Sequence, residues 1–356
     1  MPPRVTAPAL PPRLSPGMTI GVVSPASGAK DPGTLPRGAA RLESLGYRVK
    51  PGRHAAGRLG YLAATDRERA DDLQRMFADP KIDAIVCLRG GYGCLRLLPL
   101  LDFDAIRATP KILCGFSDIT TLNLALLKHA GMVSFSGPMI GFTFAAKKPV
   151  TFAEAGFFRT LGGDGDPGAA PVAAGSVWQG HPEEKRGPRR FRVVNAGRAT
   201  GPLTGGCLSL VAASIGTAHQ PDTAGRIVFL EDIDEAPYGI DRMLTQMRLA
   251  GLFDKAAGVV FGRLTPHRDY RRNEKAHAAE TGAVKPLTAK TAAARGPAHE
   301  HLMDEAIALA MAGLDIPIMT GLPFGHIPNH ATLPFGVAAT MDTRTGDLTI
   351  DEPAVR

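Results

Sequence analysis

Three segments far apart in the chain each contain a side chain of the kind that serine hydrolases use: Ser117, Glu231 and His326. A serine hydroxyl is a poor nucleophile until a neighbouring base takes its proton. An imidazole serves as that base when an anionic group fixes its tautomer and stabilises the cation that it becomes. The three residues therefore predict a nucleophile, an orienting acid and a base, provided that the fold brings them together.

Ser117 lies between an apolar run at 112–114 and a helix-like run at 119–127. A serine at a helix N-terminus is close to free backbone amides, which favour developing negative charge. We therefore predict the amide of Asp118 as an oxyanion donor. The alternative is that Ser117 or Asp118 is only a helix N-cap. Because Ile119 stands where the nucleophile elbow G-x-S-x-G has its second glycine, an α/β-hydrolase fold is disfavoured.

A glycine-rich segment, Arg89-Gly90-Gly91-Tyr92-Gly93, follows another apolar run. Glycines permit close backbone approach and positive φ angles. We predict the amide of Gly91 as the second oxyanion donor, beside the serine. Two alternatives stay open: a tight turn that binds no ligand, and a phosphate-binding loop. The segment has neither G-x-x-x-x-G-K nor a full G-x-G-x-x-G, so nucleotide binding is weakly supported.

Four acidic side chains lie within residues 231–235, directly after the predicted strand 226–230, whose last four residues are apolar. Active sites of open parallel sheets gather at the carboxyl ends of strands. Glu231 is the first residue past the run and is expected to point inward. The other acids are expected in a solvated turn or, for Glu235, as a helix cap. The residues alone leave open which of the four acids is the functional one. A metal site is disfavoured, because histidines at ligand spacing are missing.

His326 lies in a segment, 321–330, that has glycine and proline on both sides of the histidine. These residues would hold the imidazole in a defined place. The alternative is a hydrogen-bonded loop histidine without a catalytic role. His330 is the weaker candidate for the base.

The elements that must position these residues alternate between strand and helix in the first part of the chain. Such alternation predicts a parallel sheet with helices on both faces. We expect strands at 18–24, 47–50, 84–88 and 112–114 and helices at 35–45 and 65–77, followed in the second part by strands at 226–230, 258–261 and 316–319 and a helix at 240–250.

Composition narrows the class of protein. The chain has 356 residues, 44% of them hydrophobic and 21% charged, which is typical of a globular protein with a sizeable core. Its net charge of +7 is spread widely and its aromatic fraction is only 6%, so nucleic acid is disfavoured as a partner. The four cysteines form no C-x-x-C pair, which favours a reducing compartment and no metal. The first 14 residues contain no apolar signal-peptide region, and no apolar run reaches membrane-spanning length, so we expect a cytoplasmic protein without a membrane partner.

The pattern divides the chain into four parts. We predict a disordered leader at 1–14, an N-terminal α/β domain with the nucleophile at 15–148, and a linker at 149–201 that is rich in glycine, proline and alanine. The C-terminal domain, 202–356, is predicted to contain the glutamate and the histidine. Within it, the polar stretch 268–300 is predicted to be an inserted surface loop, with a lid as the alternative.

In order and spacing, the motifs resemble those of the LD-carboxypeptidase family of serine peptidases over nearly the whole chain. This family includes muramoyl-tetrapeptide carboxypeptidases of peptidoglycan recycling and microcin-C immunity peptidases. The motifs are Ser24-Pro25-Ala26-Ser27, Arg69-Ala70-x-Asp72-Leu73, Arg89-Gly90-Gly91-Tyr92-Gly93, Gly115-Phe116-Ser117-Asp118-Ile119-Thr120, Gly205-Gly206, Leu230-Glu231-Asp232, Pro237-Tyr238-x-Ile240-Asp241-Arg242 and Gly325-His326.

The resemblance implies a Ser-His-Glu triad of Ser117, His326 and Glu231, with the amides of Gly91 and Asp118 as the oxyanion hole. It implies a flavodoxin-like or Rossmann-like N-terminal domain, a smaller β-rich C-terminal α/β domain, and an active site in the cleft between them. The implied reaction is hydrolysis of the amide between an L-centre, such as meso-diaminopimelate, and a C-terminal D-amino acid in muropeptides. A cytoplasmic homodimer without cofactor or metal is implied as well.

The chain departs from the family pattern at positions that bear on specificity. Cys207 stands where the family often has asparagine, Ser136 replaces a more usual histidine, and the 268–300 insert is long. Two rival functions therefore stay open. One is an amidase that cleaves aminoacyl-nucleotide compounds of the microcin-C type. The other is a muropeptide-binding protein without catalysis.

Overall fold

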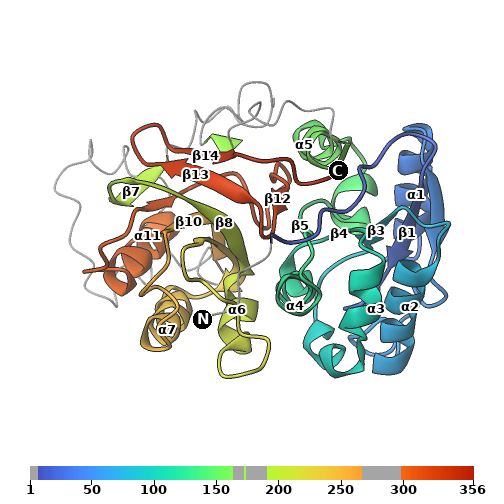
Figure 1. The fold of residues 1–356 in the computed structure, drawn as a ribbon, viewed down its shortest axis with the longest axis horizontal. Coiled ribbons are helices and arrows are strands. Elements are labelled where there is room, and N and C mark those ends of the chain that lie inside the picture. The colour runs from blue at the N-terminus through green and yellow to red at the C-terminus, as the bar shows by residue number, and fades with distance from the viewer. Residues whose placement is uncertain (1–6, 163–171, 174–190, 267–297) are drawn as a thin grey trace.

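The structure is a computed structural model that describes residues 7–162, 172–173, 191–266 and 298–356. Two sheets lie side by side, each with its own helices (Figure 1). Residues from the first half of the chain form most of one sheet, and residues from the second half form most of the other. The fold is mixed α/β, as the sequence predicts.

The first sheet has six strands in the order β12-β5-β4-β3-β1-β2. Five of them run parallel in the order 2-1-3-4-5, which is the flavodoxin-like arrangement. The sixth, β12, comes from the C-terminal part of the chain and pairs antiparallel with β5. The strands are β1 (Thr19–Val23), β2 (Arg48–Pro51), β3 (Ala84–Cys87), β4 (Ile112–Cys114), β5 (Phe135–Ser136) and β12 (Leu333–Pro334).

Helices cover both faces of this sheet, because its strands are apolar on both sides. One core cluster joins Ile85 and Leu113 to α2, α3 and α4, and the other joins Val86 and Ile112 to α1 and α5. The α-helices are α1 (Thr34–Ser44), α2 (Asp66–Ala78), α3 (Phe103–Ala108), α4 (Thr120–Ala125) and α5 (Thr151–Gly162). Short helical turns are η1 (Cys94–Arg96), η2 (Leu98–Leu100), η3 (Ser117–Ile119), η4 (Leu126–Ala130) and η5 (Ile140–Phe144).

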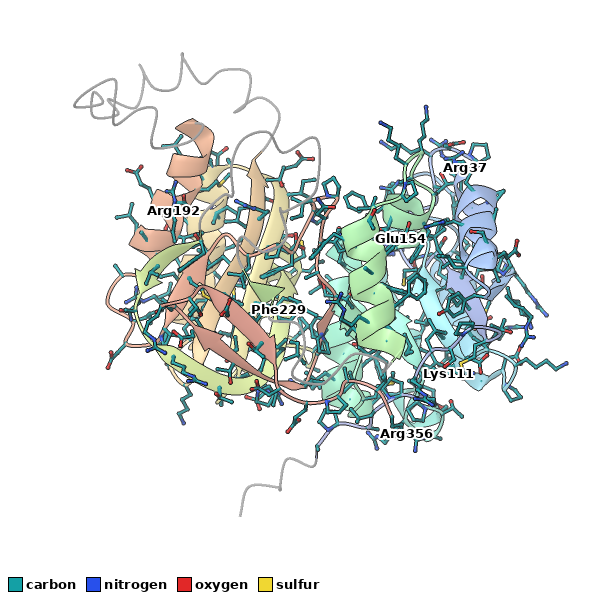
Figure 2. All side chains as sticks on the ribbon, turned by 90° about the horizontal axis from the view of Figure 1, so that it is seen from above. Arg37, Lys111, Glu154, Arg192, Phe229 and Arg356 are labelled. Carbon is teal, nitrogen blue, oxygen red and sulfur yellow. The ribbon has the colours of Figure 1, made fainter. Side chains whose placement is uncertain are left out.

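The second sheet has eight strands in the order β6-β14-β13-β8-β9-β10-β11-β7. Its centre, β8 to β11, is parallel, and its margins pair antiparallel. Phe229, the third residue of β9, is fully buried among other apolar side chains (Figure 2). The strands are β6 (Val172–Ala173), β7 (Arg192–Asn195), β8 (Arg198–Cys207), β9 (Ile227–Glu235), β10 (Gly258–Pro266), β11 (Ile318–Thr320), β13 (Ala338–Asp342) and β14 (Asp347–Ile350). The helices are α6 (Leu208–Ser214), α7 (Pro237–Leu249) and α11 (Ala298–Ala310).

The prediction of a disordered leader is wrong for residues 9–14. Ala9 bridges to Met132, Leu14 is 2% exposed, and the backbone around them is hydrogen-bonded to the C-terminal residue Arg356. Paired backbone and buried apolar surface order this segment. Residues 1–6 lie outside the described part of the chain.

The predicted linker contains regular structure. Helix α5 occupies its beginning, because Phe157 and Leu161 pack into the same core cluster as β3 and β4. Strand β8 starts at Arg198, before the predicted domain boundary. The rest of the linker, except for β6, β7 and the residues next to β7, is outside the described residues, and so is the predicted insert up to residue 297. The last residues of that insert, 298–300, begin helix α11.

Candidate active site

Ser117 occupies a strained turn between β4 and α4. Its φ is 65°, a left-handed value that among the described non-glycine residues only Asp234 shares. Such a conformation costs about 1–3 kcal/mol and is concentrated at functional sites. A nucleophile elbow holds its serine on a turn of this kind between a strand and a helix. The turn after β4 thus resembles an elbow in conformation although its sequence does not match the elbow pattern.

Gly90 lets the loop after β3 lie directly against this turn. A Cβ atom at Gly90 would lie 2.7 Å from Cβ of Ser117 and 3.0 Å from its Oγ. Carbon atoms that are not bonded to each other do not approach so closely, so only glycine fits without a shift. The loop predicted to supply an oxyanion donor is therefore in contact with the predicted nucleophile.

This contact leads to a prediction for Gly90→Ala. The added methyl group must displace Ser117 or the loop, and misplacement by about 1 Å can cost about 10²-fold in rate. On the substrate that the resemblance implies, an LD-tetrapeptide, we expect kcat to fall at least about tenfold. The matched control is Gly156→Ala in α5, where a Cβ meets nothing within 4 Å. Equal activity of the two variants would contradict the prediction.

Glu231 and His326 are brought together from opposite ends of the C-terminal half. Nδ1 of His326 lies 2.7 Å from Oε2 of Glu231, and the glutamate is only 2% exposed. Gly325, with φ at 109°, makes this approach possible, since a Cβ there would lie 2.7 Å from the same carboxylate oxygen. The carboxylate therefore fixes which ring nitrogen of His326 carries hydrogen, and Nε2 is left able to accept a proton.

The surroundings of His326 favour the protonated imidazole, relative to a histidine that is exposed to water. Burial lowers the pKa of His326, but the charge and hydrogen bond of Glu231, with smaller contributions from Asp232 and Asp234, outweigh it, so the pKa is raised. An imidazolium at this position is therefore stabilised, as a general base requires after it takes a proton.

Two contacts connect this pair to the turn that contains Ser117. The ring of His326 lies edge-on against Phe116, the residue before the serine, with centroids 5.0 Å apart. The amide of Cys207 donates to Thr120 Oγ1 at 3.0 Å, and Cys207 is the residue that pairs with Glu231 across β8 and β9. Strand β8, which pairs with the strand of the acid, thus meets the start of α4, directly after the serine turn.

His330, the weaker candidate, has a packing role. It is 2% exposed and lies against Phe116 at 4.8 Å between centroids, and its Nδ1 is 3.1 Å from the carbonyl oxygen of Ile327. Burial lowers its pKa to about 4, so the ring is neutral at pH 7.

One of the two predicted oxyanion donors lies within the serine turn, and the other lies in the loop that contacts this turn. Gly91 has φ at 122° and belongs to the loop that contacts Ser117. Among the hydrogen bonds of the described residues, none uses the Gly91 amide as donor, whereas the next amide, of Tyr92, donates to Ser27 Oγ at 3.2 Å. The Asp118 amide belongs to η3, immediately after the serine.

The acidic segment 231–235 lies within strand β9, whereas the sequence pattern predicted it beyond the end of the strand. Strand β9 continues through Glu235, because its pairing with β10 continues there across two register shifts. Asp232 is 3% exposed and accepts hydrogen bonds from the amides of Ser209, at 2.7 Å, and Ile233, at 2.8 Å. Burial, and secondly the charge of Glu231, raise the pKa of Asp232 to about 6. Asp232 is thus a buried partner of the site and not part of a solvated turn.

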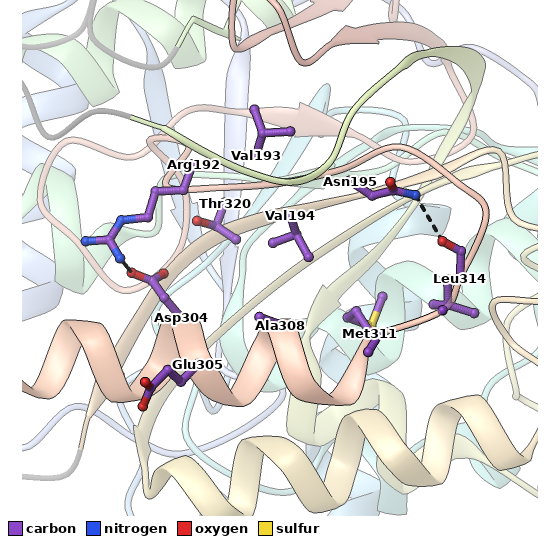
Figure 3. A pocket seen from close by; sticks show the side chains of 12 residues that line it. Arg192, Val193, Val194, Asn195, Asp304, Glu305, Ala308, Met311, Leu314 and Thr320 are labelled. Atoms are coloured by element: carbon purple, nitrogen blue, oxygen red, sulfur yellow. Dashed lines mark hydrogen bonds and ion pairs between the residues drawn. The ribbon is translucent and has the colours of Figure 1, made fainter. Parts of the chain in front are cut away.

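A pocket of about 650 Å³ lies elsewhere, between β7 and α11 (Figure 3). It is lined by apolar side chains, the Arg192–Asp304 ion pair and Asn195, and none of the predicted site residues lines it. Over the ranges that the structure describes, no group of three or more histidine, cysteine or acidic side chains could hold a metal ion. The described helices also include none with the length and hydropathy to cross a membrane.

Comparison with known proteins agrees with the resemblance seen in the motifs. Residues 20–137 match the LD-carboxypeptidase N-terminal domain, and residues 200–341 match the LD-carboxypeptidase C-terminal domain. The chain belongs to the LD-carboxypeptidase family. It is 30% identical to the murein tetrapeptide carboxypeptidase of Pseudomonas aeruginosa over 306 residues, and this alignment covers 85% of this chain and 86% of that protein.

Solved structures share the fold of this LD-carboxypeptidase family member. The muramoyltetrapeptide carboxypeptidase of Oxalobacter formigenes is 29% identical, with a TM-score of 0.73 over 93% of this chain and 97% of that one. The microcin C7 self-immunity protein MccF has a TM-score of 0.78 over 98% of this chain and 100% of its own, at 24% identity. The two-sheet α/β architecture is therefore that of the family.

Proposed function

We propose that this LD-carboxypeptidase family member is a serine-type enzyme that hydrolyses the amide between an L-centre, such as meso-diaminopimelate, and a C-terminal D-amino acid in muropeptides. The observation that supports it most is the 2.7 Å contact between His326 and Glu231, made beside the strained turn of Ser117. The relatives named as murein tetrapeptide and muramoyltetrapeptide carboxypeptidases favour this substrate class. A role in peptidoglycan recycling follows from the substrate.

The mechanism proposed is acyl transfer. His326 takes the hydroxyl proton through Nε2 as Ser117 Oγ attacks the scissile carbonyl carbon, and Glu231 stabilises the imidazolium. The amides of Gly91 and Asp118 donate to the oxyanion, and each donor is worth about 10²–10³ in rate in comparable enzymes. The intermediate then collapses: the C–N bond breaks, His326 returns the proton to the departing amine, and water hydrolyses the acyl-enzyme by the same steps.

The test is mass spectrometry of the purified protein with a muropeptide mixture. We expect tetrapeptides to lose the mass of one alanine residue, as free D-alanine is released by hydrolysis, whereas peptides with a terminal L-alanine stay intact. Unchanged tetrapeptides, with a folded protein at micromolar concentration, would contradict the proposed substrate.

The second candidate is an amidase for aminoacyl-nucleotide compounds, favoured by the 25% identity over 327 residues to the microcin C7 self-immunity protein MccF of Escherichia coli. A substrate panel with an LD-tetrapeptide and an acyl-sulfamoyl adenylate distinguishes the two. A binding protein without catalysis is distinguished by a fluorophosphonate probe, because a serine that no base activates does not react with it.

The pH dependence of the reaction follows from the base. His326 must be neutral to accept a proton, and its pKa is raised by Glu231. We therefore expect kcat/KM to fall as the pH drops, with the midpoint of this acid limb above 6.5, the ordinary value for histidine. A pH–rate profile of the free enzyme measures it, and a midpoint well below 6.5 would contradict the assigned role of the pair.

The cytoplasmic location and the homodimer stay predictions. Sedimentation of the purified protein is expected to give the mass of two chains, and a single-chain mass at micromolar concentration would contradict the dimer.

A further inference from the structure

The loop 89–94 has little to hold its own shape. Two of its glycines, Gly91 and Gly93, have φ angles near 120°, at 122° and 123°, where other residues are strained. A glycine-rich loop also loses more conformational freedom on ordering than other segments. Its position relative to Ser117 therefore depends on the contacts that anchor it. Besides the hydrogen bond from the Tyr92 amide to Ser27 Oγ, two such contacts hold the end of the loop.

The side chain of Asp118 is one anchor, and it extends from the serine turn itself. Its Oδ2 accepts a hydrogen bond from the amide of Cys94 at 2.8 Å, and the residue is only 2% exposed. A carboxylate that accepts a backbone amide in a buried place makes a strong, directional bond. One side chain thus joins the turn that contains the nucleophile to the end of the loop that contains Gly91.

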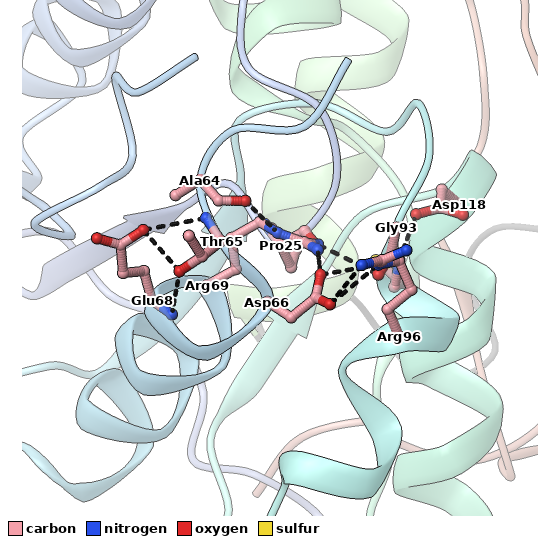
Figure 4. Close-up of polar contacts among 10 residues, drawn as sticks. Pro25, Ala64, Thr65, Asp66, Glu68, Arg69, Gly93, Arg96 and Asp118 are labelled. Carbon is pink, nitrogen blue, oxygen red and sulfur yellow. Dashed lines mark hydrogen bonds and ion pairs between the residues drawn. The ribbon is translucent and has the colours of Figure 1, made fainter. Parts of the chain in front are cut away.

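Arg69 of α2 is the second anchor, from beneath the loop (Figure 4). This guanidinium is 1% exposed and donates to three carbonyl groups, those of Pro25, Ala64 and Gly93. Gly93 fits only as glycine, because a Cβ there would lie 2.8 Å from Nη1 of Arg69. Asp66 balances the charge of Arg69 and itself accepts three hydrogen bonds from Arg96 (Figure 4).

We propose that the Asp118 carboxylate, supported by Arg69, is a positioning group that sets the distance between the amides of Gly91 and Asp118. This inference rests on the proposed function, in which both amides donate to one oxyanion. Two donors serve one oxygen only if each lies about 2.7–3.1 Å from it, so a loop that moves outward by a fraction of this distance loses one of them. Asp118 thereby has two roles. Its backbone amide donates to the oxyanion, and its side chain holds the loop that contains the other donor, the amide of Gly91.

The test compares Asp118→Ala with Asp118→Asn. Asparagine retains a side-chain oxygen that can accept the Cys94 amide, and alanine does not. We expect Asp118→Asn to retain at least about a third of the wild-type kcat. We expect Asp118→Ala to lose about 30- to 100-fold in kcat with little change in KM, and a similar factor in its rate of labelling by a fluorophosphonate, since both reactions need the same oxyanion donors.

The control for a purely structural effect is Asp102→Ala. Asp102 caps α3 by accepting the amides of Asp104 and Ala105, so its loss also removes a carboxylate that binds backbone, but away from the serine. Asp102→Ala is expected to lower the melting temperature and leave kcat unchanged. If Asp118→Ala does not fold, Asp118→Ser replaces it, because the serine hydroxyl is too short to reach the Cys94 amide.

The outcomes separate this inference from the proposed function. A wild-type protein that neither turns over an LD-tetrapeptide nor labels would overturn the proposed function, and with it the role of Asp118. An active wild type whose Asp118→Ala variant labels at the same rate would overturn the positioning role alone. An Asp118→Asn variant as slow as Asp118→Ala would also overturn the positioning role, because the loss of rate would then not come from the hydrogen bond to the Cys94 amide.

Discussion

Ser117→Ala is expected to abolish hydrolysis of an LD-tetrapeptide, by about 10⁵-fold or more in kcat, while the protein stays folded and binds its substrate. Removal of a nucleophile in a triad costs this much because the base and acid have nothing left to activate. Turnover measured by release of D-alanine, and substrate binding measured by calorimetry, separate the chemical step from binding. Full activity in this variant would remove Ser117 as the nucleophile.

A second substitution at the same position tests whether the turn is strained. Ser117 has φ at 65°, a region that glycine occupies without penalty. We expect Ser117→Gly to be inactive but more stable than Ser117→Ala by about 1 kcal/mol in chemical denaturation. Ser214→Ala serves as the control, since that buried serine donates to Val211 in α6, away from the site. Equal stability of the two Ser117 variants would mean that the turn is not strained.

Glu231→Gln is expected to have the second largest effect, a loss of about 10³–10⁴-fold in kcat at nearly unchanged KM. The amide side chain fits the same space but does not stabilise the imidazolium, and it allows the wrong tautomer of His326. Because the charge that raises the pKa of His326 is removed, the acid limb of the pH–rate profile is expected to move to lower pH. The kinetics and the profile are measured on the same preparation.

The control for loss of a buried charge is Glu154→Gln. This glutamate in α5 is also buried and pairs with Arg41 at 2.6 Å, away from the serine turn. It is expected to lower stability and leave kcat unchanged. A Glu231→Gln enzyme that retains more than a tenth of the wild-type kcat, or whose acid limb does not move, would contradict the role of Glu231 as the orienting acid.

Much of the α/β core was predictable from local pattern. Helix α2 begins at Asp66, one residue after the predicted start of the helix at residue 65, because Thr65 is its N-cap and forms a reciprocal capping box with Glu68. Helix α1 ends just before Gly46, whose φ of 91° is one that glycine favours. These signals lie within a few residues of the boundary that they set, so a single sequence contains them in full.

Other features depend on contacts between distant segments, and the local pattern missed them. The order of residues 9–14 depends on hydrogen bonds to Gly131 and Arg356. The burial of Asp232 depends on strand β9 continuing beside β10. The structural roles of Arg69 and of the Asp118 side chain were likewise missed, although both residues lie in motifs shared with the family.

The residue types that can act as nucleophile, acid and base were determined by the sequence alone, and so were the loops that contain Ser117 and His326, since these depend on neighbours in the chain. The place of Glu231 was not, because it lies within strand β9 and not beyond it. Only the tertiary structure decided that Nδ1 of His326 meets Glu231, 95 residues away, and that the ring of His326 lies against Phe116, the residue before Ser117. Convergence of this kind depends on strand order and register in two sheets, which are set by the packing of the whole chain and leave no signal in any short segment.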